Sequence, residues 1–100
     1  MKLRSFEEGL LRELQTPEFA AAYLEDALTE SVEEFLVALR KYVQANGGMT
    51  HGAEQSTLTR EALYRMLSTE GNPELRSIHA LLRAHGLKFS IQPTGETLAA

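Results

Sequence analysis

The sequence predicts an all-α domain of about six helices, and three observations support this. Helix-start and helix-stop residues recur at close spacing along the chain. Between them, apolar residues recur every three or four positions, which is the period of a helix with one buried face. Only residues 87–92 alternate apolar and polar residues as a strand does. With 100 residues, of which 43% are hydrophobic, the chain has the size and composition of one small globular domain.

Three helices are expected in the first half of the chain. The first and third begin at capping boxes, in which a serine precedes a glutamate by three residues: Ser5 with Glu8, and Ser31 with Glu34. Thr16 before Pro17 predicts the start of the second, because proline is favoured at the first helical position. Asn46-Gly47-Gly48 ends the third. The expected core positions are Phe6, Leu10 and Leu14, then Phe19, Tyr23, Ala27 and Leu28, then Val32, Phe35, Leu36, Leu39 and Val43.

Three shorter helices are expected in the second half. Residues 50–56 fit a helix of two turns, and Thr59 can cap another that runs from Arg60 to Ser68. Asn72 as the cap and Pro73 at the first position predict the start of the last helix. Gly86 ends this helix, which is expected to bury Leu75, Ile78 and Leu82.

A strand is expected over residues 87–92, with Leu87, Phe89 and Ile91 on its buried face. A lone strand needs a partner, and the same strand of a second copy is the candidate, which predicts a homodimer with these three residues at its interface. Pro93 ends the strand. Residues 1–93 are therefore expected to form one domain and residues 94–100 a loose tail.

Composition and motifs exclude several classes of protein. The absence of cysteine excludes a disulfide scaffold, a thiolate zinc site and cysteine catalysis. No phosphate-binding loop, dinucleotide fingerprint or nucleophile elbow occurs, and the three histidines lack metal-ligand spacing. We therefore expect no enzyme activity, no metal and no cofactor. Apolar runs are only a few residues long and no signal core is present, which predicts a cytoplasmic protein without a membrane partner.

Charge is distributed unevenly along the chain, whose net charge is −4. Residues 1–48 hold five Lys or Arg against nine Asp or Glu, whereas residues 49–92 hold five against four. This asymmetry permits an anionic partner on the second half without requiring one. Acidic side chains on the second and third helices form either a solvated face or a surface that attracts a basic protein: Glu25, Asp26, Glu30, Glu33 and Glu34.

The two short helices over residues 50–68, joined by a tight turn, fit a helix-turn-helix pattern. On a helical wheel the core-facing arc of the second helix is Ala62, Leu63, Met66 and Leu67, and the outward arc is Arg60, Glu61, Tyr64, Arg65 and Ser68. Arginine can bind guanine bidentately and a carboxylate can accept from cytosine, so the outward arc is either a DNA-reading face or a solvated one. The same two interpretations apply to Arg76, His79 and Arg83 on the last helix. His85, just before Gly86, is expected to interact with the carbonyl groups at the end of that helix.

Four segments together resemble the family of probable addiction module antidotes, which are HigA-like antitoxins with a Cro/lambda-repressor-like helix-turn-helix. The segments are YLEDAL, FLVALRKYVQANGGMT, LTREALYRMLSTEGNP and LLRAHGLKFSIQP, and the resemblance covers residues 6–93. It implies a type II antitoxin that neutralises a small RelE/HigB-like toxin and represses its own operator DNA as a dimer. Residues 50–56 and 60–68 then form the helix-turn-helix, with DNA-facing residues at Thr50, Thr59, Arg60, Glu61, Tyr64, Arg65 and Ser68.

Two residues depart from the family pattern. Gly52 stands where a leucine is usual, which is expected to cost helix propensity and to leave a hole in the packing. Thr57 stands where the turn usually has glycine, and its β-branch disfavours a positive φ. Either the helix-turn-helix is distorted or neighbours compensate. The alternative function is therefore a module of the same fold that binds a toxin or other protein without binding DNA.

Overall fold

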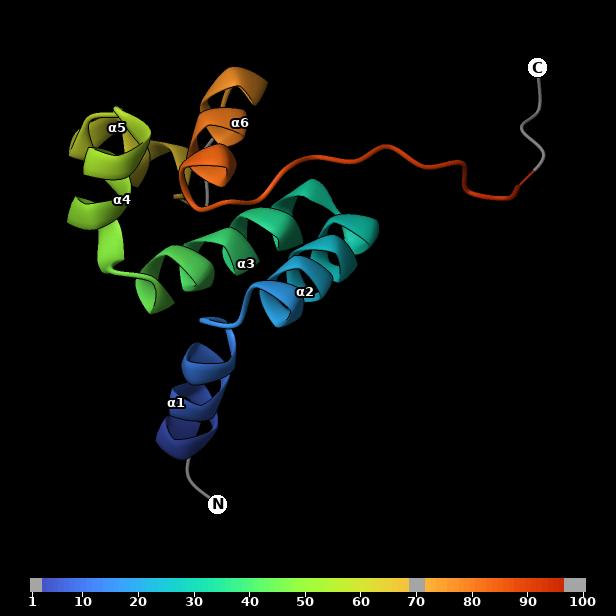
Figure 1. Cartoon of the computed structure of the whole chain (residues 1–100), viewed down its shortest axis with the longest axis horizontal. Coiled ribbons are helices and arrows are strands. Elements are labelled where there is room, and N and C mark those ends of the chain that lie inside the picture. The colour runs from blue at the N-terminus through green and yellow to red at the C-terminus, as the bar shows by residue number, and fades with distance from the viewer. Residues whose placement is uncertain (1–2, 69–71, 97–100) are drawn as a thin grey trace.

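The computed structural model describes residues 3–68 and 72–96, and within them the fold is all-helical (Figure 1). Six helices follow one another: α1 (Leu3–Glu13), α2 (Pro17–Glu30), α3 (Val32–Ala45), α4 (Gly48–Ser56), α5 (Arg60–Met66) and α6 (Leu75–Ala84). The expected all-α class and number of helices are confirmed for this part of the chain. None of its helices has the length and apolar character needed to cross a membrane.

The helices form two groups that meet at α3 and α4. In the first, α2 packs against α3, and α1 contacts the other end of α3 (Figure 1). In the second, α4 contacts α5, α6 and α3, so α4 connects the two groups. One core runs through both, and its largest fully buried side chains are Leu14, Leu39, Leu63, Leu67, Leu81 and Val43. The packing of α4 at the centre fixes how the short helices are presented to solvent.

Most of the predicted helix boundaries are confirmed. α2 begins at Pro17 with Thr16 as its N-cap, and the Ser31 hydroxyl accepts a hydrogen bond from the Glu34 amide at 2.9 Å. α3 ends before Gly47, whose φ of 109° lies in the left-handed region that glycine favours. The local capping rules therefore locate α2 and α3 correctly.

Four predicted boundaries are wrong. α4 begins at Gly48, two residues before the predicted start, because Gly47 and not a later residue is its N-cap. α1 begins at Leu3, so Ser5 lies inside it, because serine is only a moderately poor helix residue and does not force a start. α5 ends at Met66, two residues before Ser68. Glu74 has extended backbone angles and is the N-cap of α6, so Asn72 and Pro73 precede that helix.

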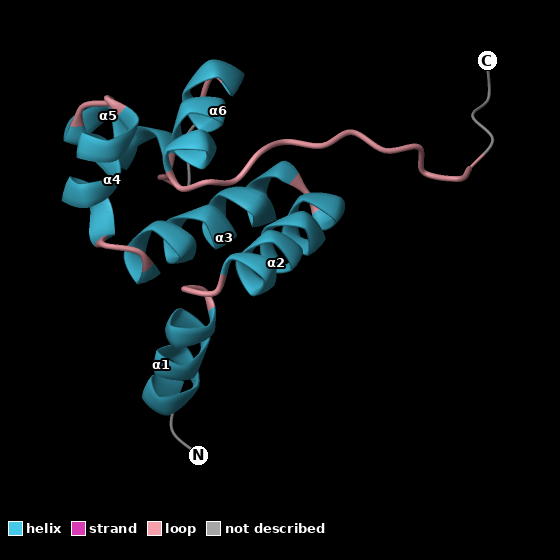
Figure 2. Ribbon diagram, viewed as in Figure 1, coloured by secondary structure: helices cyan, strands magenta, loops and turns pink. Residues whose placement is uncertain are grey.

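The predicted strand over residues 87–92 is also wrong for the described chain. Residues 87–96 form an extended segment without strand pairing, which we call the arm (Figure 2). A strand needs a neighbour to share backbone hydrogen bonds, and no other described segment runs beside the arm as a strand. The predicted tail falls partly on residues 97–100, which lie outside the described part of the chain.

The junction between α6 and the arm is a Schellman motif. Gly86 has a φ of 81°, its amide donates to the Arg83 carbonyl, and the Leu87 amide donates to the Leu82 carbonyl at 2.8 Å. The prediction that Gly86 ends α6 is confirmed. These bonds fix the direction in which the arm leaves the helix.

Four residues expected in the core are exposed instead. They lie near an end of their helix, where the neighbouring helix no longer covers them, or on the side of α2 that faces solvent. They are Phe6 (60% exposed), Leu28 (42%), Val32 (56%) and Leu75 (68%). Periodicity identifies the apolar face of a helix, but it does not say how far along that face a neighbour extends.

Candidate nucleic-acid interface

Helices α4 and α5 are joined by a turn of three residues, 57–59, and pack against each other. The Thr59 hydroxyl caps α5 by accepting a hydrogen bond from the Ala62 amide at 3.0 Å, as predicted. On the inner side of α5, Leu63, Met66 and Leu67 are buried. This packing turns the opposite side of α5 outward.

Gly52 leaves no hole between α4 and its neighbours, so the expectation of a packing defect is wrong. The residue is buried, and a Cβ atom at this position would lie 3.2 Å from Leu63 Cδ2 and 3.2 Å from Val43 Cγ1. These distances are shorter than ordinary van der Waals contact. The lack of a side chain allows α4 to approach α3 and α5 closely, which is a known reason for glycine within an element.

Thr57 adopts the left-handed conformation at the C-cap of α4, with φ 61° and ψ 14°. Among the described residues it is the one non-glycine residue with positive φ. Its hydroxyl donates to the Ser56 carbonyl at 2.5 Å. The turn therefore has a backbone conformation at Thr57 that glycine adopts more easily, and the β-branched threonine is strained there.

The outward side of α5 presents four of the five side chains that the sequence predicts there: Arg60, Glu61, Tyr64 and Arg65 are exposed, as is the N-cap residue Thr59. The fifth, Ser68, lies beyond the end of the helix and is half-buried. The Arg60 guanidinium carbon lies 5.4 Å from the centre of the Tyr64 ring, and its Nη2 is 3.5 Å from the Tyr64 hydroxyl. Tyr64 thus orients Arg60 by a cation–π contact. Thr50 on α4 is also exposed.

The buried side of α5 is tied to α3 by a residue that sequence reasoning missed. Arg40 Nη2 donates a hydrogen bond to the backbone carbonyl of Leu67, the C-cap residue of α5. A signal was available, because Arg40 follows the buried Leu36 by four residues and precedes the buried Val43 by three. A cation at such a position within an apolar stripe is typical of a specific buried partner.

The outward stripe of α6 carries Arg76, His79 and Arg83, all exposed as expected. His85 lies at the C-cap, with Nδ1 3.0 Å from the Leu81 carbonyl, which confirms the predicted interaction at the helix end. Nδ1 must donate in this contact, since a carbonyl oxygen only accepts. Within residues 3–68 and 72–96 no three potential ligands gather into a metal site.

The three residues expected at a dimer interface are not equivalent in the structure. Leu87 and Phe89 are half-buried and pack against the core of their own chain. Ile91 is 98% exposed. Of the three apolar residues that predicted the strand, Leu87 and Phe89 are therefore held against their own chain, and Ile91 is exposed to solvent.

Residues 3–93, which include all six helices and the base of the arm, match the family model described as a probable addiction module antidote protein. The chain is also similar to an uncharacterized protein of Haemophilus influenzae strain Rd. The two are 32% identical over 80 residues, which cover 79% of this chain and 81% of that protein. No solved structure matches the chain.

Proposed function

Since the chain belongs to the family of probable addiction module antidotes, we propose that it is a type II antitoxin that neutralises a small RelE/HigB-like toxin. We propose further that it binds its own operator as a homodimer and represses transcription there. In this proposal α4, the turn and α5 form a Cro/lambda-repressor-like helix-turn-helix, and the chain acts by binding, without catalysis or a cofactor.

The observation that carries the DNA-binding part is the combination of a capped, tightly packed α5 with a polar outward face. Leu63 and Leu67 are fully buried on one side, while Arg60 and Arg65 are exposed on the other. A recognition helix needs this division, because its inner face must anchor it while its outer face enters the major groove. The close approach at Gly52 and the left-handed Thr57 support an undistorted α4–α5 unit.

Each outward side chain has a chemical role in this proposal. Arg60 and Arg65 contact guanine edges or phosphates, and Glu61 accepts from cytosine. Thr50 and Thr59 can donate their hydroxyl protons to the phosphate backbone. The Ser68 hydroxyl donates to the Arg65 carbonyl at 2.9 Å, so in this proposal Ser68 reaches DNA only if that bond is released. Tyr64 positions Arg60. Because one subunit supplies few cations, a dimer is needed for useful affinity, and binding should weaken steeply with salt.

The test is fluorescence anisotropy of labelled DNA from upstream of the chain's own reading frame, measured at low and physiological salt against random DNA of equal length. We expect preference for the upstream DNA and its loss on the double substitution Arg60→Ala with Arg65→Ala. The matched control replaces Arg12 on α1 and Lys88 on the arm with alanine, which removes the same charge from two exposed cations outside α4, α5 and α6. Normal operator binding by the Arg60/Arg65 variant would refute the assignment of α5.

The second candidate function is toxin binding without DNA binding. It is favoured by an acidic surface on α2 and α3, away from α5: residues 17–39 contain six carboxylates and no Lys or Arg. A basic protein would be attracted to such a surface. Pull-down of the toxin expressed from the neighbouring gene separates the candidates, because toxin capture by a chain that shows no operator preference would favour this second function.

A further inference from the structure

The C-terminal ends of α1 and α3 are joined by the side-chain amide of Asn46. This residue is the C-cap of α3, and its Nδ2 donates to the Leu14 carbonyl at 3.1 Å and to the Tyr42 carbonyl at 2.9 Å. A primary amide has two N–H donors, so both are used. Leu14 lies just after α1, where carbonyl groups have no partner within the helix. Asn46 therefore closes the ends of two helices with one group.

α1 is attached to the rest of the molecule at this end. It packs against α3, and its other end projects away from the body (Figure 1). Leu14 at the junction is fully buried, whereas Phe6 is 60% exposed. Gln15 Nε2 adds a longer hydrogen bond, at 3.3 Å, to the Ala45 carbonyl. The docking of α1 therefore depends on a few groups at one end, among which Asn46 makes the shorter of these two contacts between the helices.

Gly47 follows Asn46 for a separate reason. Its φ of 109° lies in the left-handed region. A Cβ atom at this position would lie 2.7 Å from His51 Cγ and 2.9 Å from His51 Cβ, which is too close for any side chain. The fold thus requires asparagine for its two donors and glycine for its lack of a side chain, and it places the two in sequence.

Asn-Gly is the dipeptide in which asparagine cyclises most readily, because no side chain obstructs the nitrogen of the glycine. The Gly47 nitrogen bonds to Asn46 Cγ, the bond from Cγ to Nδ2 breaks, and Nδ2 leaves as ammonia with the proton from Gly47. Water then opens the cyclic imide to an aspartate or isoaspartate carboxylate. The Gly47 amide makes no backbone hydrogen bond to any described residue, so its nitrogen is available for this attack.

We propose that Asn46 is a deamidation site that is protected while α1 is docked and that prevents redocking once it has reacted. The reaction removes Nδ2, so both of its hydrogen bonds must be lost before ammonia leaves, and the docked state slows it. The product carries a carboxylate, which has no proton to donate to the carbonyl groups of Leu14 and Tyr42. Repulsion between these oxygen atoms disfavours the return of α1, so its release becomes irreversible.

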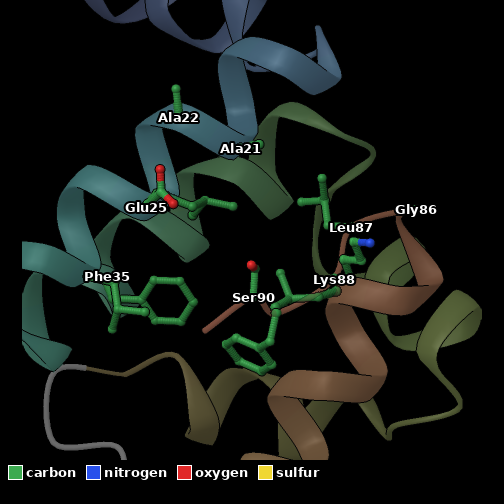
Figure 3. A pocket seen from close by; sticks show the side chains of 12 residues that line it. Ala21, Ala22, Glu25, Phe35, Gly86, Leu87, Lys88 and Ser90 are labelled. Atoms are coloured by element: carbon green, nitrogen blue, oxygen red, sulfur yellow. The ribbon is translucent and has the colours of Figure 1, made fainter. Parts of the chain in front are cut away.

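The arm is attached in a different way. Leu87 and Phe89 pack on the core and line an open groove of about 470 Å³ between the arm and α2 (Figure 3). The junction of the arm with α6 is closed by backbone hydrogen bonds, among them the bond from the Leu87 amide to the Leu82 carbonyl. Neither set of contacts involves Asn46, so deamidation should release α1 and leave the arm in place.

Deamidation of the natural full-length chain tests the protection. Samples are kept folded in buffer or unfolded in guanidinium chloride, and peptide mapping by mass spectrometry measures the fraction of Asn46 that is converted. We expect conversion to be at least about tenfold slower in the folded chain, since two hydrogen bonds must open first. Asn72 is the internal control, because it precedes Pro73, whose nitrogen carries no proton, and it should stay intact.

Low concentrations of denaturant, below the unfolding transition, should speed conversion in step with hydrogen exchange of the α1 amides. Equal conversion in folded and unfolded chains would overturn the proposed protection, and an intact Asn46 in the unfolded chain would overturn the site itself. Conversion that rises only with global unfolding would show that the docking of α1 does not protect the amide.

The variant Asn46→Asp carries the carboxylate from the start and tests its consequence. Hydrogen exchange should be at least about tenfold faster at the α1 amides than in the natural chain, and unchanged at the Leu87 amide. Asn72→Asp, the same substitution at an exposed position, is the matched control and should leave α1 unchanged. Natural exchange of α1 in Asn46→Asp would refute the proposal. Faster exchange throughout α4, α5 and α6 would also refute it, because the amide would then support the whole fold and not α1.

Discussion

Arg40 on α3 donates a hydrogen bond from its guanidinium to the backbone carbonyl of Leu67, the C-cap residue of α5. Leu67 is fully buried, so its carbonyl cannot readily exchange this partner for water. Arg40, a side chain of α3, thus fixes the C-terminal end of α5, the helix that we propose reads DNA.

Replacing Arg40 with alanine should therefore lower stability and loosen α5. We expect a loss of about 1–3 kcal/mol in the free energy of unfolding, the usual cost of leaving a buried carbonyl unpaired. Denaturant unfolding followed by circular dichroism measures it. Gln44→Ala, at an exposed position of the same helix, is the control and should change little. Equal stability of the two variants would show that the bond contributes nothing to the fold.

Gly52 should not tolerate the leucine that is usual in the family. The added side chain would meet Leu63 and Val43, which already lie 3.2 Å from an ideal Cβ, and overpacking of this kind costs about 1–3 kcal/mol or more. Thermal unfolding of Gly52→Leu checks this. Gly9→Ala in α1 is the contrasting variant, because nothing lies within 4 Å of its Cβ position and helix propensity should add up to about 1 kcal/mol. A Gly52→Leu variant more stable than the natural chain would show that a cavity does lie beside Gly52.

Thr57→Gly should stabilise the chain by about 1 kcal/mol, because glycine adopts the left-handed conformation without the strain of a β-branch. The flexibility of glycine in the unfolded chain offsets part of this gain. Thr50→Gly, on the exposed side of α4, should instead destabilise, since glycine is a poor residue within a helix. Melting temperatures of the two variants should move in opposite directions.

Stability should fall at alkaline pH through Tyr42. Burial raises the pKa of the Tyr42 phenol above its usual 10.0, so the folded chain favours the neutral form. Its contribution to stability is complete below pH 10 and is lost as the pH rises through the folded pKa. Urea unfolding at pH 8 and pH 11 should show a smaller loss for Tyr42→Phe than for the natural chain. An equal loss for Tyr42→Phe and the natural chain would show that Tyr42 does not carry this pH dependence.

Local rules explain which parts of this protein the sequence determines by itself. Caps act within a few residues, so Ser31, Thr59 and Gly86 mark their helix ends correctly. The period of the apolar residues identifies α5 as a helix with one buried face, and it therefore identifies its outward side chains as well. The resemblance to the antidote family rests on the same local segments, and the family match to residues 3–93 agrees with it.

Tertiary structure alone decided the remaining features, because they depend on distances between residues far apart in the chain. Packing against Val43 and Leu63 gives Gly52 its role as a close contact in place of the expected hole. The partner of Arg40 lies 27 residues away. Alternation of apolar and polar residues predicts the strand over residues 87–92. Such alternation shows that a segment has two faces, but it does not show whether a second strand lies beside it. Only the folded chain places Leu87 and Phe89 on the body and leaves Ile91 in solvent, where a second molecule can reach it.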